Sequence, residues 1–145
     1  MDYPFRDTLP FYFVQISGYL NEVFNQSLSE FDITIPMYRV LVALRDGQSR
    51  MLNQIAQALD VEQSTLSRQI TTMVKLGLVS RTRPDENGRI VQIVITDHGR
   101  QVVEKMIPVA QNLESIAIGD CSNDDIDATK QVLRKIYTNM RPSIS

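Results

Sequence analysis

The apolar residues in the middle of the chain change from helical to alternating spacing, and this change constrains the fold more than any other feature. Short helices are predicted over about 51–59 and 63–76, joined by only three residues. Two segments of β character, the second rich in β-branched residues, follow at 78–83 and 90–96. The Asn-Gly pair between them is typical of a hairpin turn, because both residues tolerate positive φ. Two short helices followed at once by a hairpin predict a winged helix-turn-helix.

Longer amphipathic helices are predicted on both sides of this segment. One covers about 9–31, and the next runs from the N-cap Thr34 to Gly47. After the hairpin, a helix is predicted over about 97–118, and a last helix opens at Ser122. The expected fold is therefore mainly α with a small β-hairpin wing.

Composition excludes several classes of protein. One cysteine, Cys121, excludes an intrachain disulfide, and one histidine, His98, leaves too few ligands for a Cys/His metal site. A nucleophile–base pair of these two residues stays open, but Cys121 lies in a polar stretch between two predicted helices, where a surface thiol is the simpler interpretation. We expect no catalysis, no cofactor and no metal.

The apolar runs and the first residues bear on where the protein works. No apolar run is long enough to cross a membrane. The first ten residues contain Asp2, Arg6 and Asp7 and no apolar secretory core. The sequence therefore predicts a cytoplasmic protein.

Positive charge is concentrated in the middle of an acidic chain. The net charge is −2, but the stretch from Arg45 to Arg100 holds eight Lys/Arg against six Asp/Glu, a balance of +2, which leaves −4 for the rest. Such a distribution favours contact with DNA more than the net charge suggests. A solvated surface with no partner would give the same pattern, so the charge distribution alone does not decide whether the chain binds DNA.

One face of the second short helix has the residue types that a DNA groove requires. Its members are small hydrogen-bonding residues and two cations, at i, i+4, i+7, i+8 and i+11: Ser64, Arg68, Thr71, Thr72 and Lys75. Hydroxyls suit phosphates or base edges, and arginine suits guanine or phosphate. The helix start, Gln63-Ser64-Thr65, presents backbone N–H groups to an anion. The alternative is a solvated helix face, which is less fitting because the face has no carboxylate and the hairpin adds Arg81, Arg83 and Arg89.

The run QSTLSRQITTMVKLGLVSR, from Gln63 to Arg81, resembles the recognition helix of the MarR-type transcriptional regulators. The Asn87-Gly88-Arg89 segment, followed by Ile95-Thr96 and Gly99, is similar to the wing pattern of that family, and the resemblance covers nearly the whole chain. It implies a sequence-specific DNA-binding regulator, acting as a homodimeric repressor of a palindromic operator. The DNA-binding residues expected are Gln63, Ser64, Thr65, Ser67, Arg68, Thr71, Thr72, Lys75, Arg81, Arg83, Asn87 and Arg89.

The wing departs from the family pattern at one position. The family usually has aspartate where this chain has Asn87, and that carboxylate is commonly interpreted as supporting the wing arginine. Asparagine accepts a hydrogen bond but carries no charge, so the positioning of Arg89 is in question. Asp85 or Glu86 could take over this role from two residues or one residue away.

The resemblance also implies how the chain is divided. Residues 34–96 would form the winged helix-turn-helix DNA-binding domain, and residues 1–33 and 97–145 a helical dimerisation region that interlocks with a second copy. The long apolar stripes near both termini agree with this, because little of the chain is left to cover them. Packing of these helices within one monomer is the alternative.

A small-molecule effector is the last implication. Many members of the family bind an aromatic or phenolic carboxylate, or an acyl thioester, between the two lobes, and others sense oxidants through a cysteine in the first helix. This chain has no cysteine there. The candidate pocket residues are Phe11, Tyr12, Met37, Tyr38 and Arg39, for which ordinary core and interface roles are equally open. Two functions thus stand side by side: a ligand-responsive DNA-binding regulator, and a winged-helix module for protein contacts that has lost DNA binding.

Overall fold

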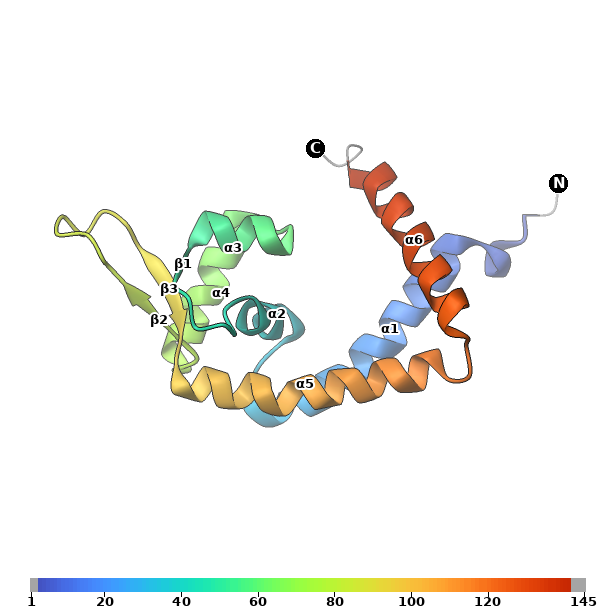
Figure 1. Cartoon of the computed structure of the whole chain (residues 1–145), viewed down its shortest axis with the longest axis horizontal. Helices are drawn as coiled ribbons and strands as arrows, with labels where there is room; N and C mark the ends of the chain where they lie inside the picture. Colours follow the sequence, from blue (N-terminus) through green and yellow to red (C-terminus); the bar gives the residue numbers. More distant parts are fainter. Residues whose placement is uncertain (1–2, 142–145) are drawn as a thin grey trace. The chain divides into compact units, whose positions relative to one another are not determined.

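A computed structural model describes residues 3–141 of the chain (Figure 1). The elements follow in the order η1 (Phe5–Asp7), α1 (Leu9–Leu28), η2 (Ser29–Phe31), α2 (Ile35–Ala43), β1 (Arg50–Met51), α3 (Leu52–Leu59), α4 (Gln63–Lys75), β2 (Val79–Thr82), β3 (Gln92–Ile95), α5 (Asp97–Ile118) and α6 (Asn123–Met140). Two compact units divide the chain, Met1–Ala110 and Gln111–Ser145, and each is described by itself. The mainly helical fold with a small wing is confirmed.

Side-chain caps explain where several of the helices begin. The hydroxyls of Thr8 and Thr34 accept the backbone N–H three residues on, at 3.3 and 3.5 Å, and a proline follows each cap in the first turn. Ser122 caps α6 in the same way, accepting from the Asp125 N–H at 3.1 Å. These starts agree with the sequence prediction to within a residue or two.

The helix-turn-helix consists of α3 and α4 and a tight connection. Asp60 adopts the left-handed conformation at φ 54°, and the Val61 N–H donates to the Ala56 carbonyl at 3.0 Å, which turns the chain at the end of α3. Ile55 from α3 and Leu66 from α4 are fully buried. The apolar faces of both helices therefore belong to one core.

The sheet has one strand that the sequence analysis missed. Its order is β1-β3-β2, all antiparallel, with Arg50 opposite Ile93 and Val79 opposite Ile95. The two residues of β1 are too few to show alternation, and they become a strand only by pairing with β3. The hairpin of β2 and β3 extends away from α3 and α4 (Figure 1).

The hairpin turn also differs from the prediction. The strands end at Thr82 and begin again at Gln92, so a long loop joins them rather than a two-residue turn. Gly88 has φ +62°, but Asn87 is not among the residues with positive φ. The Gly88 N–H donates to the Asp85 carbonyl at 3.2 Å. Asp85 and Gly88 thus occupy the first and fourth positions of a β-turn, which both residue types favour.

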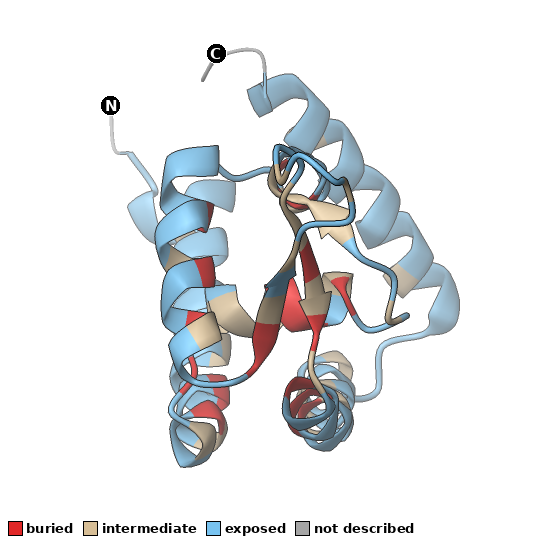
Figure 2. Cartoon of the chain, turned by 90° about the vertical axis from the view of Figure 1, so that its left-hand side faces the viewer, coloured by how far each residue is buried: buried red, intermediate tan, exposed pale blue. Residues whose placement is uncertain are grey.

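The buried residues hold the first unit together. The inner faces of β2 and β3 and of the helices around them are buried (Figure 2). The first half of α5 joins this core through Val102, Val103 and Met106. Because α5 leaves the sheet directly after β3, the wing and the long helix share one set of core contacts.

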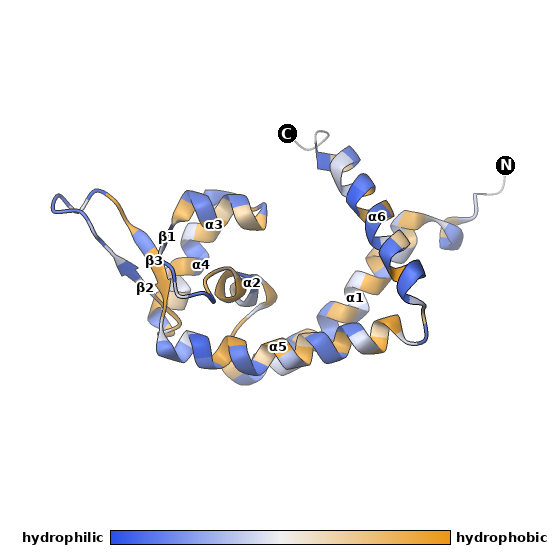
Figure 3. Ribbon diagram, viewed as in Figure 1, coloured by the Kyte–Doolittle hydropathy of each residue, from blue (hydrophilic) through white to orange (hydrophobic). Residues whose placement is uncertain are grey.

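Large apolar residues stay exposed on α1 and toward the C-terminus (Figure 3). On α1 they recur at helical spacing: Leu9, Tyr12, Phe13, Ile16, Tyr19 and Val23. On the second unit they are Ile116, Val132, Leu133, Tyr137 and Met140, and α6 buries none of its described residues. Over residues 3–141 there is no helix with the length and apolar character needed to cross a membrane.

Candidate nucleic-acid interface

The polar face predicted for α4 is a continuous exposed face of the helix. Leu66, Ile70 and Met73 are buried on one side of the helix. The opposite side carries the five polar residues predicted from the spacing, and all five are exposed: Ser64, Arg68, Thr71, Thr72 and Lys75. Gln63, Thr65 and Ser67 are exposed on the first turns of the same helix. The burial of three apolar residues therefore fixes which face of α4 is open to a partner.

Three cations of this region are unpaired. Within residues 3–141, the side chains of Arg68, Lys75 and Arg89 make no hydrogen bond or ion pair, and all three are exposed. By contrast, Arg45 and Arg50 are held by Glu104 and Asp46. Unpaired cations are available to an anionic partner at no cost of breaking an internal bond.

Arg81 connects the wing strand β2 to the helix α4. From β2, its Nη2 donates to Oγ1 of Thr71 on α4 at 2.9 Å. The hydroxyl of Thr71 in turn donates to the Ser67 carbonyl at 3.1 Å. Arg81, which the sequence predicts as a DNA-binding residue, thus also makes a hydrogen bond within the protein.

The two threonines of α4 use their hydroxyl protons inside the helix. Thr71 donates to Ser67, and Thr72 Oγ1 donates to the Arg68 carbonyl at 3.3 Å. Ser64, Thr65 and Ser67 make no such bond in the described part of the chain. The face therefore combines free hydroxyls near its N-terminus with committed hydroxyls farther along.

Asp85 organises the wing loop. Its carboxylate accepts the backbone N–H groups of Ile90 and Arg89, each at 3.0 Å. These two bonds hold the pKa of the Asp85 carboxyl below its usual value, because they favour the charged form. Arg83 closes the loop from the other side, its Nη1 donating to the Gly88 carbonyl at 2.8 Å. Asp85, one of the two substitutes considered for the carboxylate absent at Asn87, thus fixes the backbone of Arg89.

The predicted effector residues fall into two groups. Phe11 and Tyr12 lie near the start of α1. The centroid of the Phe11 ring lies 5.5 Å from that of Phe5 and 5.7 Å from that of Tyr12, in edge-to-face arrangements. Tyr38 on α2 packs edge-to-face against Phe24, with the two ring centroids 4.9 Å apart. Burial raises the pKa of the Tyr38 hydroxyl. Phe11 and Phe24 are 13 residues apart on one helix, about 20 Å along its axis.

Two residues flank Tyr38 on α2: Met37, which is half-buried, and Arg39, which is exposed. Along α1, the aromatic contact that involves Tyr38 is thus far from the one that involves Phe11. The effector pocket remains a prediction from the family resemblance.

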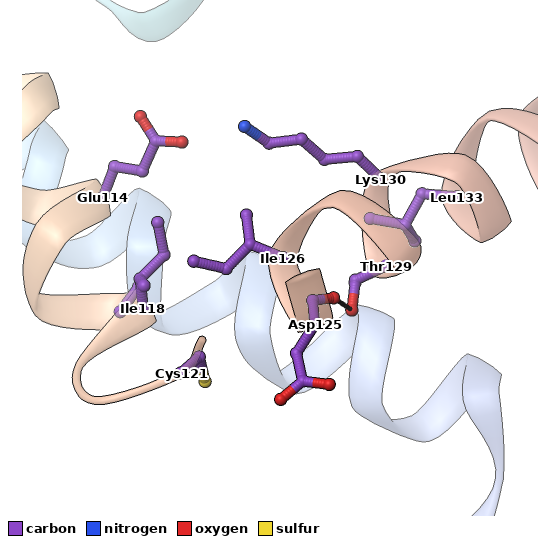
Figure 4. A pocket seen from close by; sticks show the side chains of 9 residues that line it. Glu114, Ile118, Cys121, Asp125, Ile126, Thr129, Lys130 and Leu133 are labelled. Carbon is purple, nitrogen blue, oxygen red and sulfur yellow. Dashed lines mark hydrogen bonds between the residues drawn. The ribbon is translucent and has the colours of Figure 1, made fainter. Parts of the chain in front are cut away.

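A separate hollow of about 280 Å³ lies between the end of α5 and α6, within the second unit (Figure 4). Ile118 and Ile126 form its apolar floor, and Glu114 and Lys130 extend over it from opposite sides. Cys121, exposed in the loop between the helices, lies at its edge. This hollow belongs to the face that α6 leaves uncovered.

Known proteins resemble the chain along most of its length. The family model of the transcriptional regulator SarA/Rot matches residues 22–106. The transcriptional repressor IacR of Pseudomonas putida is 24% identical over 136 residues, 93% of this chain and 81% of the relative. The organic hydroperoxide resistance transcriptional regulator of Bacillus subtilis is 26% identical over 111 residues, 77% of this chain and 72% of the relative.

Solved structures agree with these relatives. The MepR–DNA complex of S. aureus superimposes with a TM-score of 0.82 at 25% identity, over 91% of this chain and 98% of that one. BpsR of Bordetella bronchiseptica, whose DNA binding is described as regulated by 6-hydroxynicotinic acid, superimposes with a TM-score of 0.82 at 23% identity. The match covers 94% of this chain and 98% of that one.

The fold and its exposed face define a winged helix-turn-helix transcriptional regulator. The chain belongs to the SarA/Rot family of transcriptional regulators, whose model matches residues 22–106. It shares its fold with solved MarR-family regulators, such as that of Silicibacter pomeroyi, at a TM-score of 0.76 and 24% identity, over 93% of this chain and 91% of that one.

Proposed function

We propose that this regulator binds duplex DNA as a homodimer, with α4 in the major groove and the β2–β3 wing against the flanking minor groove or its phosphates. The single observation that carries the proposal is the set of unpaired cations, Arg68 and Lys75 on α4 and Arg89 on the wing. They come from two elements that Arg81 and Thr71 tie together. A cationic, acceptor-poor surface on a helix and an adjacent hairpin suits a phosphate backbone.

The predicted site residues divide by role in this proposal. Arg68 and Ser64 lie at the centre of the α4 face and would approach base edges. Gln63, Thr65, Ser67 and Lys75 would contact phosphates, and Arg89 the groove beside the wing. Arg81, Arg83 and Asn87 would act through the shape of the wing, since the first two already bond within the protein.

Dimerisation is supported by the apolar surfaces that one chain leaves uncovered. The stripe on α1 and the face of α6 each expose several large apolar side chains. Monomers rarely expose such contiguous stripes to water. In this proposal the second copy covers both stripes and the α5–α6 hollow, so residues 1–33 and 97–145 form the dimerisation region and residues 34–96 the DNA-binding domain.

Repression and release by a small aromatic or phenolic ligand complete the proposal. A repressor among the relatives and the regulation of BpsR by 6-hydroxynicotinic acid support this direction. The operator would be a pseudo-palindrome, because a two-fold dimer presents two equivalent helices. We place the protein in the cytoplasm, with its DNA, and assign it no catalytic role.

A protein-interaction module that has lost DNA binding is the competing function. A surface for protein contacts does not need Arg68, Lys75 and Arg89 to be free of carboxylate partners. A phosphate-binding surface needs these cations to be free. The unpaired cations therefore favour DNA.

Selection from a randomised duplex pool tests the proposal. The chain should enrich a two-fold symmetric sequence, and its affinity should fall steeply with salt. Arg68→Ala should cost about 1–3 kcal/mol of specific binding if Arg68 contacts a base edge, and Arg68→Lys, which keeps the charge without the planar fork, should restore only part of it. If no sequence is enriched and affinity is indifferent to salt, the protein-interaction function is favoured.

A further inference from the structure

We propose that Thr72 is a specificity-determining residue that recognises a thymine through its γ-methyl group, while Thr71 beside it positions the helix. The inference rests on the proposed function, because it requires α4 to lie in a major groove. It goes further by assigning a base and a chemical group to one side chain.

The hydroxyl protons decide what these threonines can offer. A threonine hydroxyl has one proton to donate. Thr72 gives it to the Arg68 carbonyl at 3.3 Å, and Thr71 gives it to the Ser67 carbonyl at 3.1 Å. Phosphate oxygens only accept hydrogen bonds. Neither threonine can therefore bond a phosphate while these helix bonds stand.

The methyl group is the part of each side chain left for a partner. A threonine in a helix has two branches on Cβ, and here the oxygen branch turns back to the preceding turn. Both residues are exposed on the face opposite Leu66, Ile70 and Met73, so the methyl branch is open to solvent. Thymine is the base that presents a methyl group in the major groove, and the threonine methyl is a known kind of partner for it.

The two threonines are not equivalent. The Thr71 oxygen also accepts from Arg81 Nη2 at 2.9 Å, so this residue holds the wing strand against α4. Within residues 3–141, Thr72 makes no side-chain hydrogen bond to the wing. It lies on the opposite edge of the exposed face, 100° further around the helix. Thr71 is the positioning residue, and Thr72 is the one whose free methyl can meet a base.

The free hydroxyls fit the same division. Ser64, Thr65 and Ser67 make no side-chain hydrogen bond within residues 3–141, and they lie at the start of α4, where backbone N–H groups also point outward. Phosphate contact suits Thr65 and Ser67, while Ser64, at the centre of the face, can approach a base edge. Base discrimination by methyl contact is then left to the second half of the helix.

Deoxyuridine substitution tests the inference with two variants of Thr72. The probe is the duplex that the wild-type chain selects from the randomised pool, with each thymine replaced in turn by deoxyuridine, which removes only the methyl group. We expect the wild type to lose about fourfold in affinity at one thymine of each half-site, the equivalent of about 0.8 kcal/mol for a buried methyl group. Thr72→Val, which keeps a methyl group, should show the same loss at the same position.

Thr72→Ser separates the methyl group from the hydroxyl. It should bind the thymine duplex about as weakly as the wild type binds the deoxyuridine duplex, and it should be indifferent to deoxyuridine there. Thr71→Ser is the matched control, because it keeps the bond to Arg81, and it should leave the sensitivity at that position intact. Thr72 is exposed, so circular dichroism should show all variants folded.

Two results would overturn the inference while leaving DNA binding intact. One is a wild-type chain whose affinity is unchanged by deoxyuridine at every thymine. The other is a Thr72→Val chain that binds poorly while Thr72→Ser binds like the wild type, which would assign recognition to the hydroxyl. If the pool yields no selected sequence, the proposed function fails and the inference fails with it.

Discussion

The α-carbon of Gly99 lies against the carbonyl oxygen of Leu78, so closely that a β-carbon on Gly99 would stand 2.1 Å from that oxygen. The same carbonyl accepts the Thr96 N–H at 3.1 Å. The Thr96 hydroxyl donates to the Gly77 carbonyl at 2.5 Å and accepts from the Gly99 N–H at 3.0 Å. The first turn of α5 is thereby fixed to the segment that leads from α4 into the wing.

Gly99→Ala should destabilise the protein, because the new methyl group meets backbone rather than a side chain that can move. Overpacking of this kind typically costs about 1–3 kcal/mol. Urea unfolding measures the loss. The control is His98→Ala at the neighbouring exposed position, where a change within about 0.5 kcal/mol is expected. Equal stabilities of the two variants would mean that α5 and Leu78 are not in this contact.

Asp85→Ala should loosen the wing loop, since it removes the acceptor of the Arg89 and Ile90 N–H groups. Hydrogen exchange of these two amides should accelerate, and DNA affinity should fall. Glu86→Ala, at the neighbouring exposed position, should leave both amides protected. Protection lost equally in the two variants would assign no special role to Asp85.

The wing should also withstand mild acid. The pKa of Asp85 is lowered in the folded protein, so its contribution is complete above the ordinary pKa of 3.8 and is lost only as the pH falls through the lowered value. Amide protection of Arg89 and Ile90, corrected for the intrinsic exchange rate, should therefore be constant between about pH 8 and pH 5. A loss within that range would contradict the ionised carboxylate as the acceptor.

Asp46 should titrate at an unusually low pH. Arg50 donates from Nη1 to Oδ1 at 2.9 Å and from Nη2 to Oδ2 at 2.5 Å, and the Gln48 N–H adds a bond at 3.0 Å. The bond from Arg50 and then that from Gln48 lower the pKa of Asp46 to about 2 from 3.8. Its stabilising effect is thus present above 3.8 and lost as the pH falls through about 2.

Arg50→Gln should move this pKa back toward 3.8, as measured by NMR titration of the carboxyl group. Arg39→Gln, which removes a cation from α2 without touching Asp46, should leave it in place. If the pKa of Asp46 were the same in the Arg50→Gln variant as in the wild type, the Asp46–Arg50 pair would not persist in solution.

Ile16→Asp should convert a dimer into a monomer. Ile16 is 52% exposed in the single chain and lies within the apolar stripe of α1. Light scattering at micromolar concentration should give about twice 16.5 kDa for the wild type and one chain mass for the variant. Asn25→Asp adds the same charge on the opposite side of α1 and should remain dimeric. Thiol alkylation of Cys121 should be faster in the monomer, because the α5–α6 hollow opens.

Periodicity and caps were sufficient to predict the helices. Thr34 and Ser122 mark helix starts in the sequence because capping is local chemistry, and the caps were found where they were expected. The face of α4 was also predictable, since the spacing of Leu66, Ile70 and Met73 fixes what lies opposite.

Features that depend on distant partners were not predictable. β1 exists only through its pairing with β3, and the Arg81–Thr71 bond joins two elements whose distance the sequence does not reveal. The family pattern draws attention to Asn87, whereas the loop is organised by Asp85, which was only one of two candidates. The committed hydroxyls of Thr71 and Thr72 follow from side-chain geometry and leave no trace in residue type.

Hydroxyl-radical footprinting of the selected duplex tests the central claim most directly, because it reports both the dimer and the two DNA-contacting elements. The account predicts two protected half-sites centred about 10 bp apart on one face of the duplex, with weaker protection beyond each where the wing reaches. Arg89→Ala should remove the outer protection and leave the inner. A single asymmetric protected segment, or outer protection that survives Arg89→Ala, would contradict a dimer that binds through α4 and the wing.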